Sequence, residues 1–453
     1  MCGVIAIFNK QPNNLIILEL LNSLKKLQNR GRDSYGILLS NYGKITLAKS
    51  HELIGIKNIE NQNLHKSLYK VALGHSRYST SYNEDKRDLK MTQPFKGNNK
   101  LGEFYLIHNG NINFGKDVVR GFPDLNDTQI MVKIIEREFG ETWMEIFGKI
   151  IRKIPGVYNI IVFANNKLYA FKDRYNVRPL CLGSNNMGYS VASESCALSN
   201  YTYKREILGG ELVEISENGI RSEKIVQPIN TSCIFEYIYF LNPSSKINDI
   251  DVFSIRYALG EKLGFNDGIR QNNDIVVIGS PDTGIPSGIG FAKSQGLIYL
   301  QFLEKNKNKG RSFIMADDNQ RKDECLKKFI INPEYSIKDK IVYFVDDSMV
   351  RGNTTKRIVK LLKEYEPREI HIRISSPKIV DICKFGIDIP TKDELIMANY
   401  SEEEYVKEIG INSLKFLKLD DMLEVVGKSL GVSIDSFCKG CFSGVYQQHL
   451  LDW

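Results

Sequence analysis

The chain has 453 residues, 42% of them hydrophobic and 25% charged, which is the composition of a globular protein with two or three domains. Its net charge of +7 is small and dispersed, so we expect no nucleic-acid partner, and no apolar run approaches the ~20 residues of a membrane span. Met1 and Cys2 lead directly into an apolar run instead of a secretory signal, so we expect a cytoplasmic protein that does not bind membranes.

The first candidate catalytic residue is Cys2, which directly precedes a predicted strand. If Met1 is removed, Cys2 becomes the N-terminal residue, and its α-amine, with a pKa near ~8, can serve as the base for its thiol. An ordinary buried cysteine at the start of a strand is the alternative, and the Met-Cys pair alone does not exclude it.

Several polar motifs follow along the first half of the chain. Residues 13–28 have helical spacing, with a leucine at every third position, and end in a turn that contains Arg30. The later motifs are GHSRYST (residues 74–80, with Arg77 and Tyr78), HNGN (108–111, with Asn109 and Gly110) and NDT (126–128, with Asp127).

Taken singly, these motifs have ordinary structural explanations. Asp127 is as well explained as the N-cap of the helix that follows it. Asn109-Gly110 is typical of a hairpin turn. His75 and His108 are most simply structural residues, and we assign them no chemistry.

Together, Cys2 and these motifs resemble the glutaminase domain of class II glutamine amidotransferases. The resemblance covers residues 2–235 and implies the N-terminal-nucleophile hydrolase fold, with Cys2 attacking the side-chain amide of glutamine. Asn109 and the backbone N–H of Gly110 would form the oxyanion hole, which needs donors aimed at the developing negative charge.

The same resemblance implies how glutamine is bound. Arg77 would hold the α-carboxylate through a charge-assisted pair, and Asp127 would hold the α-ammonium group. Arg30 and Tyr78 would support or gate the site. One departure is Tyr82, where the family usually has a glycine; it affects the expected shape of the loop and not the chemistry.

Two further segments narrow the resemblance to the amidophosphoribosyltransferase family. They are FKDRYNVRPL (residues 171–180) and VASESCAL (residues 191–198). This family uses glutamine-derived ammonia to open purine synthesis.

The second half of the chain alternates predicted strands and helices, as in a parallel α/β sheet. Residues 274–278 form a predicted strand, and SPDTGIPSGIG (280–290) is a glycine-rich turn that could hold pyrophosphate on its backbone N–H groups. A strand at 297–303 precedes the basic cluster from Lys305 to Arg311, which taken alone is most simply a solvated loop.

The stretch IVYFVDDSMVRGNTT (341–355) predicts a second site. An apolar strand ends in two carboxylates, Asp346 and Asp347, and a turn leads into a helix. Ligands of open α/β sheets bind at the carboxyl ends of strands, and helix N-termini bind anions. A ligand with a phosphate next to a sugar diol, or a magnesium ion, would fit this arrangement.

The stretch also resembles the loop that binds 5-phosphoribosyl-1-pyrophosphate (PRPP) in type I phosphoribosyltransferases. The resemblance implies that Asp346 and Asp347 hold the ribose hydroxyls or Mg²⁺, and that Lys305 and Arg311 belong to a loop that closes over PRPP. The implied phosphate-binding residues are Ser348, Arg351, Gly352, Asn353, Thr354 and Thr355. Some relatives place a magnesium-binding serine where this chain has Gly284, so Thr283 or water would substitute, or the two acids and the substrate alone would hold the metal.

Four of the eight cysteines match a subgroup of this family that carries a 4Fe–4S cluster: Cys233, Cys383, Cys438 and Cys441. Four thiolates are the ligand set of such a cluster, and a structural zinc site made of the same residues is the alternative. Apart from the candidate nucleophile Cys2, the remaining cysteines are expected to be packing residues: Cys181, Cys196 and Cys325.

The expected fold class is therefore α/β, with three parts. An αββα glutaminase domain (residues 2–235) precedes a phosphoribosyltransferase domain (236–430), and a tail (431–453) packs back on their junction. The expected reaction converts glutamine and PRPP to phosphoribosylamine, with ammonia passing between the two sites. We also expect purine nucleotide inhibitors and a homo-oligomer, either a dimer or a tetramer.

Two other classes of function are inconsistent with these residues. A PRPP- or nucleotide-binding regulator with one dead site would lack Cys2 or the acid pair, and both are present. A glutaminase with another acceptor, as in asparagine or glucosamine-phosphate synthesis, would lack the PRPP loop.

Overall fold

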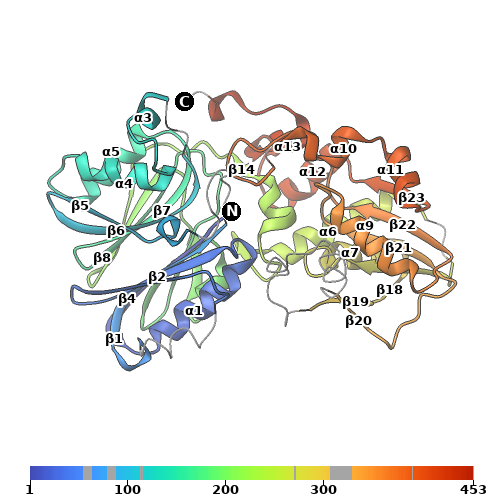
Figure 1. Cartoon of the computed structure of the whole chain (residues 1–453), viewed down its shortest axis with the longest axis horizontal. Coiled ribbons are helices and arrows are strands. Elements are labelled where there is room, and N and C mark those ends of the chain that lie inside the picture. The colour runs from blue at the N-terminus through green and yellow to red at the C-terminus, as the bar shows by residue number, and fades with distance from the viewer. Residues whose placement is uncertain are drawn as a thin grey trace.

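The computed structural model describes residues 1–54, 64–78, 88–112, 114, 116–269, 272–306, 329–389 and 391–451. The first part of the chain forms one half of the molecule, the later part forms the other half, and the N-terminus lies at their junction (Figure 1). Within these residues, no helix is long and apolar enough to cross a membrane.

Two stacked sheets make up the first half. The strands of one sheet lie in the order β11-β9-β10-β1-β4-β2-β3, and those of the other in the order β13-β12-β8-β7-β6-β5. The first sheet contains β1 (Gly3–Asn13), β2 (Ser34–Asn41), β3 (Lys44–Ser50), β4 (Tyr69–Arg77), β9 (Cys181–Ser184), β10 (Gly188–Ala192) and β11 (Thr202–Glu206). The second contains β5 (Phe95–Asn99), β6 (Gly102–Asn111), β7 (Val157–Ala164), β8 (Lys167–Lys172), β12 (Glu211–Ser216) and β13 (Gly219–Lys224).

Three apolar layers hold this half together. Alternate residues of both sheets, such as Phe8 and Ile107, meet in a core between the sheets. On the outer faces, α1 (Ile16–Lys26) packs against the first sheet, and α4 (Asp127–Arg137) and α5 (Trp143–Lys153) pack against the second. This is the predicted αββα sandwich, and the short helix α3 (Lys116–Arg120) lies beside it (Figure 1).

The predicted first helix forms, but its apolar face differs from the expected row of leucines. Leu15 and Leu18 are exposed, whereas Ile17, Leu20 and Leu24 are buried. A repeat of three drifts around a helix that has 3.6 residues per turn, so the buried face follows a spacing of three and four. Leu15 and Leu18 therefore lie outside the buried face of the helix.

The second half is built on a five-stranded parallel sheet in the order β18-β17-β21-β22-β23. Its strands are β17 (Ile275–Gly279), β18 (Ile298–Tyr299), β21 (Ile341–Asp346), β22 (Glu369–Ile374) and β23 (Ser413–Phe416). Adjacent residues of β17 enter different cores: Val277 packs in the same core as Phe291 of α7 (Ile285–Gln295), and Val276 in the same core as Ile358 of α9 (Asn353–Lys363). Both faces of the sheet are covered, as a parallel sheet requires.

Helices and small strands complete this half. The helices are α6 (Val252–Asp267), α7 (Ile285–Gln295), α9 (Asn353–Lys363), α10 (Ile396–Asn399), α11 (Glu402–Ile409), α12 (Leu419–Leu430) and α13 (Gly440–Ser443). The strand predicted at 297–303 is divided, because only Ile298–Tyr299 joins the sheet and β19 (Leu303–Lys305) pairs with β20 (Phe329–Ile331).

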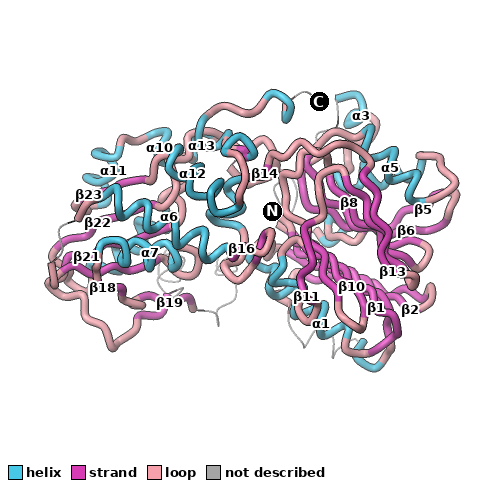
Figure 2. The backbone as a smooth tube through the Cα atoms, turned by 180° about the vertical axis from the view of Figure 1, so that it is seen from behind, coloured by secondary structure: helices cyan, strands magenta, loops and turns pink. Residues whose placement is uncertain are grey.

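The two halves share one continuous apolar core. It contains Met1 and Val177 from the first half, Ile255 from the second, and Phe442 from the tail. A parallel pair of short strands, β14 (Ser232–Cys233) and β24 (Phe437–Cys438), joins the linker to the tail at the junction, where β15 (Lys246–Ile247) pairs with β16 (Ile250–Asp251) (Figure 2).

Candidate active sites

Cys2 directly precedes β1, a central strand of the first sheet. Its thiol donates to the backbone carbonyl of Tyr78, with 3.8 Å between the sulfur and the oxygen. Burial raises the pKa of this thiol, and the adjacent terminal amine, the hydrogen bond to Tyr78 and the Arg77 guanidinium oppose that rise. The pKa of the amine on Met1 is itself lowered to about 6, chiefly by burial. This terminal amine belongs to Met1, and Cys2 would carry an α-amine of its own only after removal of Met1.

The predicted oxyanion-hole residues lie inside a strand and not in a turn. Asn109 and Gly110 belong to β6 and pair with Asn159 and Tyr158 of β7, so the hairpin alternative is wrong. The side chain of Asn109 is buried, and its Nδ2 has no hydrogen-bond partner among the described residues. A buried donor without a partner is available to an oxyanion.

Gly110 is confined by its neighbours. A Cβ atom at this position would lie 2.0 Å from the carbonyl oxygen of Val157 and 2.7 Å from Nε2 of His108. Only glycine therefore fits without a shift of the neighbouring strand.

The two predicted glutamine-binding residues lie near the nucleophile. Arg77 is the last residue of β4, and both Arg77 and Asp127 act electrostatically on the Cys2 thiol. Asp127 is the first residue of α4, but the N-cap is Asn126, whose side chain accepts from Gln129 N in a capping box. The carboxylate of Asp127 accepts from the backbone N–H of Ile112 at 3.1 Å. The N-cap interpretation of Asp127 is thus wrong, and its partly exposed carboxylate faces the site region.

Tyr78 connects the first site to the second half of the molecule. Its hydroxyl donates to Asp388 Oδ2 at 2.8 Å, and Asp388 Oδ2 lies 3.9 Å from Nη2 of Arg351. Arg351 also pairs with Glu394. Tyr78, which contacts the Cys2 thiol, is therefore connected to Arg351 of the predicted PRPP loop through Asp388.

The second candidate site lies at the carboxyl end of β21. Asp346 and Asp347 are both buried, and Asp346 Oδ1 accepts from the backbone N–H of Asp347 at 2.9 Å. Burial raises the pKa of both carboxyl groups, and the Asp347 charge raises that of Asp346 further. Arg256, buried behind the acids, opposes this rise at Asp347, as do the hydroxyls of Ser348 and Thr283. Asp347 Oδ2 has no hydrogen-bond partner in the described chain.

The turn after these acids leaves a helix N-terminus open. Gly352 has a φ of 67°, and no side chain caps the first turn of α9. Asn353 and Thr354 are exposed there and Thr355 is buried. The uncapped backbone N–H groups at the start of α9 and the nearby hydroxyls could together bind an anion. The side chain of Tyr405 fixes the turn, since its hydroxyl donates to the Gly352 carbonyl at 3.1 Å.

The departure at Gly284 has a steric explanation. A Cβ atom there would meet Ser280 Cβ at 2.9 Å and the Val345 carbonyl oxygen at 3.0 Å. Thr283 is the neighbouring hydroxyl that acts on Asp347. Lys305 Nζ lies 3.6 Å from Asp282 of the same turn, so the start of the basic cluster faces the predicted pyrophosphate site. Arg311, Tyr82 and Cys325 lie outside the described residues.

The four cysteines gather at the junction of the two halves and the tail. Cys233 and Cys438 are directly paired on β14 and β24, and Cys441 accepts at its carbonyl from the backbone N–H of Val380. Burial is the main cause that raises the pKa of Cys233, to about 11, and the neighbouring Cys383 contributes. The donor set matches a thiolate-bound group in type. Among the described residues, however, no three His, Cys, Asp or Glu side chains are close enough together to hold a metal ion as they stand.

Several residues at these sites were not singled out from the sequence. Arg178 and Glu194 lie in the two segments that narrowed the resemblance, but they received no role. Glu236, Arg256 and Asp388 had no local pattern to mark them, because each acts on a partner that is distant in sequence.

No protein-family model matches the chain. It is 34% identical to the amidophosphoribosyltransferase of Bacillus subtilis, over 98% of this chain and 94% of the relative. It is 30% identical to the enzyme of that name from Methanocaldococcus jannaschii, over 98% and 97% of the two chains. A structure of B. subtilis glutamine PRPP amidotransferase complexed with ADP and GMP has a TM-score of 0.86 at 33% identity and covers 98% of this chain and 97% of the other. A second structure, described as the allosteric regulatory enzyme of purine biosynthesis, has a TM-score of 0.85 at 32% identity, covering 98% and 96%.

Proposed function

The chain belongs to the amidophosphoribosyltransferase family, and from this premise we propose how its residues divide the reaction between two sites. The enzyme transfers ammonia from glutamine to C1 of PRPP, giving phosphoribosylamine, glutamate and pyrophosphate, the first step of purine biosynthesis. The residue roles below are proposals that rest on the geometry of each site.

At the first site, Cys2 attacks the amide of glutamine. Once Met1 is removed, the α-amine of Cys2 takes the thiol proton, and the negative oxygen that develops on the amide is held by Asn109 Nδ2 and the Gly110 N–H. The unpartnered Nδ2 of Asn109 supports this role. Arg77 and Asp127 bind the two charged groups of glutamine. Ammonia leaves, and water then hydrolyses the glutamyl thioester on Cys2.

At the second site, Asp346 and Asp347 hold the 2- and 3-hydroxyls of ribose. The 5-phosphate sits on the open N-terminus of α9, at Asn353, Thr354 and Thr355, with Ser348, Arg351 and Gly352 completing the loop. Ammonia attacks C1 as pyrophosphate departs. Lys305, together with Arg311 outside the described residues, would bind the leaving group. A magnesium ion held with the help of the two acids would neutralise the pyrophosphate charge.

The observation that carries the two-site assignment is the contact of Tyr78 with both sites. Its carbonyl accepts from the Cys2 thiol, and its hydroxyl donates to Asp388, which faces Arg351 of the PRPP loop. The shared apolar core between the halves supports a water-poor passage, which ammonia needs to stay unprotonated.

The cysteine group is proposed to hold a 4Fe–4S cluster with a structural role, because the reaction transfers no electrons. Cys233, Cys383, Cys438 and Cys441 would each supply one thiolate. Oxygen-protected protein is expected to be brown, with broad visible absorption and about four irons per chain. A colourless protein with one zinc would overturn the assignment in favour of a structural zinc site.

Other properties follow from the same family. We propose purine nucleotide inhibitors, a cytoplasmic location and a dimer or tetramer. The domain limits are proposed at 2–235 and 236–430, with the tail at 431–453. Contacts such as Thr231 Oγ1 to His449 Nε2 at 2.8 Å support a tail that packs back on the junction.

The test of the function compares two nitrogen sources. Wild-type protein should form phosphoribosylamine from PRPP with glutamine and with free ammonia. Cys2→Ala should lose the glutamine-dependent reaction and keep the ammonia-dependent one. Product from glutamine in Cys2→Ala would show that the nucleophile is wrong, and failure of wild type with both nitrogen sources would overturn the function.

A further inference from the structure

A chain of four buried charged side chains runs behind Cys2. Arg30 Nη1 lies 2.8 Å from Glu194 Oε1, and Arg30 Nη2 lies 2.8 and 3.0 Å from the two carboxylate oxygens of Glu236. Glu236 Oε1 also pairs with Arg178 Nη1 at 3.3 Å. None of the four residues is more than 2% exposed. The group is electrically balanced, with two positive and two negative charges.

One end of this chain holds the nucleophile. Arg30 Nε donates to the backbone carbonyl of Cys2 at 3.2 Å. The three nitrogens of the planar guanidinium thus contact Cys2, Glu194 and Glu236 in one plane. Because the fork is rigid, the position of the Cys2 peptide depends on where the two carboxylates stand.

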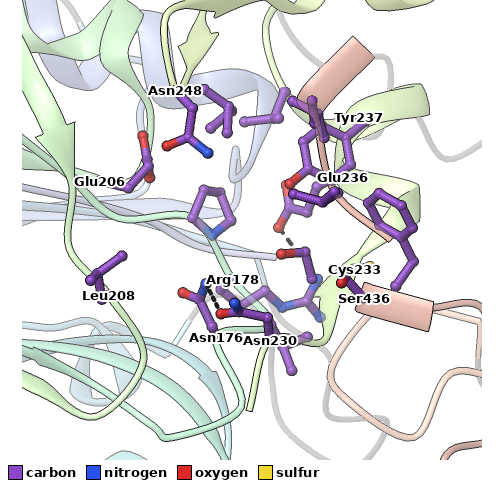
Figure 3. A pocket seen from close by; sticks show the side chains of 18 of the residues that line it. Asn176, Arg178, Glu206, Leu208, Asn230, Cys233, Glu236, Tyr237, Asn248 and Ser436 are labelled. Atoms are coloured by element: carbon purple, nitrogen blue, oxygen red, sulfur yellow. Dashed lines mark hydrogen bonds and ion pairs between the residues drawn. The ribbon is translucent and has the colours of Figure 1, made fainter. Parts of the chain in front are cut away.

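The other end belongs to the linker and the second half. Glu236 begins the π-helix Glu236–Phe240 that follows β14, and Glu194 accepts from Asn242 N at 2.7 Å. Arg178 Nη2 donates to the Phe385 carbonyl at 2.6 Å, two residues after Cys383. Arg178, Glu236 and Cys233 line a junction cavity of about 140 Å³ (Figure 3).

Stability alone does not account for this arrangement. Removing charges from water is costly, and well-packed apolar residues of similar size are often as stable as a buried ion network. The network instead fixes the orientation of its side chains, since each hydrogen bond restricts the position of the next group. The geometry therefore transmits the position of the segment at Phe385 to the peptide of Cys2.

We infer that Glu236 and Arg178 are positioning residues for the nucleophile, acting through Arg30. They hold the Cys2 peptide so that its thiol faces the amide of glutamine. This inference rests on the proposed function, because it assumes that Cys2 is the nucleophile.

The test variant is Glu236→Gln, assayed with glutamine and with ammonia in the same preparation. A small displacement of the nucleophile is expected to lower glutamine-dependent kcat about 10²-fold. The KM for glutamine should change little, because Arg77 and Asp127 are untouched. Ammonia-dependent activity should be retained, and the rate of Cys2 alkylation by a glutamine-like chloroketone should fall in parallel with kcat.

A matched control is Asp267→Asn. Asp267 is a buried carboxylate paired with Arg373 and Lys415 in the second half, at the end of α6. It should lower thermal stability without changing the ratio of the two activities. If Glu236→Gln does not fold, Glu236→Asp keeps the charge but cannot span both arginines, and it should shift the ratio in the same direction.

The outcomes separate the two ideas. An unchanged ratio of glutamine- to ammonia-dependent activity in folded Glu236→Gln or Glu236→Asp would overturn the positioning role. Wild-type protein without either activity would instead overturn the proposed function itself.

Discussion

The candidate glutamine site takes its residues from distant segments, with Cys2, Arg77, Asn109 and Asp127 placed by three different strands and a helix. The candidate PRPP site takes most of its residues from one stretch, 346–355, between β21 and α9. The first site depends on the packing of two sheets, whereas the second depends on a local turn.

The electrostatics of the two sites also differ. Behind Cys2 the buried charges are balanced, because Arg30 and Arg178 meet Glu194 and Glu236. At the PRPP site, two adjacent carboxyl groups are buried together and their pKa values are raised. The charges behind Cys2 are therefore balanced without a ligand, whereas the acids of the candidate PRPP site would gain partners, a diol and a cation, on substrate binding.

The largest effect is expected when both acids are changed. Asp346→Asn with Asp347→Asn should lower glutamine- and ammonia-dependent synthesis alike, because both reactions need PRPP. Hydrogen bonds to charged groups contribute about 1.5 to 3 kcal/mol each, so loss of two predicts a fall of about 10²- to 10⁴-fold. Steady-state assays with both nitrogen sources measure this.

The control for this pair is Asp274→Asn. Asp274 is a partly exposed acid just before β17, so it lies at the amino ends of the strands, whereas Asp346 and Asp347 lie at their carboxyl ends. It pairs with Lys340 and Arg368. It should leave both activities unchanged. If the double variant loses only the glutamine reaction, the acid pair does not belong to the PRPP site.

A smaller and one-sided effect is expected at the glutamine site. Asn109→Ala removes the unpartnered Nδ2 donor, and loss of one oxyanion-hole donor costs about 10²- to 10³-fold in kcat. Only glutamine-dependent synthesis and glutamine hydrolysis should fall. Asn98→Ala, on the exposed face of β5 in the same sheet, serves as the control. An equal loss with ammonia would contradict the assignment.

The contrast between the sites also explains what the sequence could predict. The PRPP stretch was interpretable from its own residues, since an apolar strand, two acids and a helix start lie in order. The glutamine residues needed the family resemblance, because Asn109-Gly110 alone indicates a turn and Asp127 alone a helix cap. Strand pairing between β6 and β7, which places Asn109 inside a sheet, is not visible in a local pattern.

Contacts between residues that are distant in the sequence could not be predicted at all. Glu236 and Arg30 are 206 residues apart, and Tyr78 and Asp388 are 310 apart. Nothing near either residue indicates such a contact, since the contact depends on how the two halves pack. The expectation that Cys233, Cys383, Cys438 and Cys441 share one site came from the resemblance for the same reason.

The link between the sites can be broken at one hydroxyl. Tyr78→Phe removes the hydrogen bond to Asp388 but leaves the backbone carbonyl that accepts from Cys2. If the two sites are coupled through this contact, PRPP should stimulate glutamine hydrolysis, and loss of a hydrogen bond to a charged group, about 1.5 kcal/mol or more, should make that stimulation about tenfold smaller. Hydrolysis without PRPP should be unchanged. Tyr335→Phe, a solvent-exposed tyrosine, is the control, and undiminished stimulation in Tyr78→Phe would show that the sites communicate by another route.

The smallest effect concerns stability and not catalysis. His75 is fully buried in β4, and burial lowers its pKa to about 3. The unfolded chain, with a histidine pKa near ~6.5, binds a proton that the folded chain does not, so this group's contribution to stability is complete above about pH 6.5 and is lost as the pH falls toward 3. His75→Phe should flatten the fall of melting temperature over this pH range. An unchanged slope would mean that other groups dominate the acid unfolding of the two-sheet half, while the PRPP half, which lacks such a fully buried histidine in its described residues, should follow its own carboxyl groups.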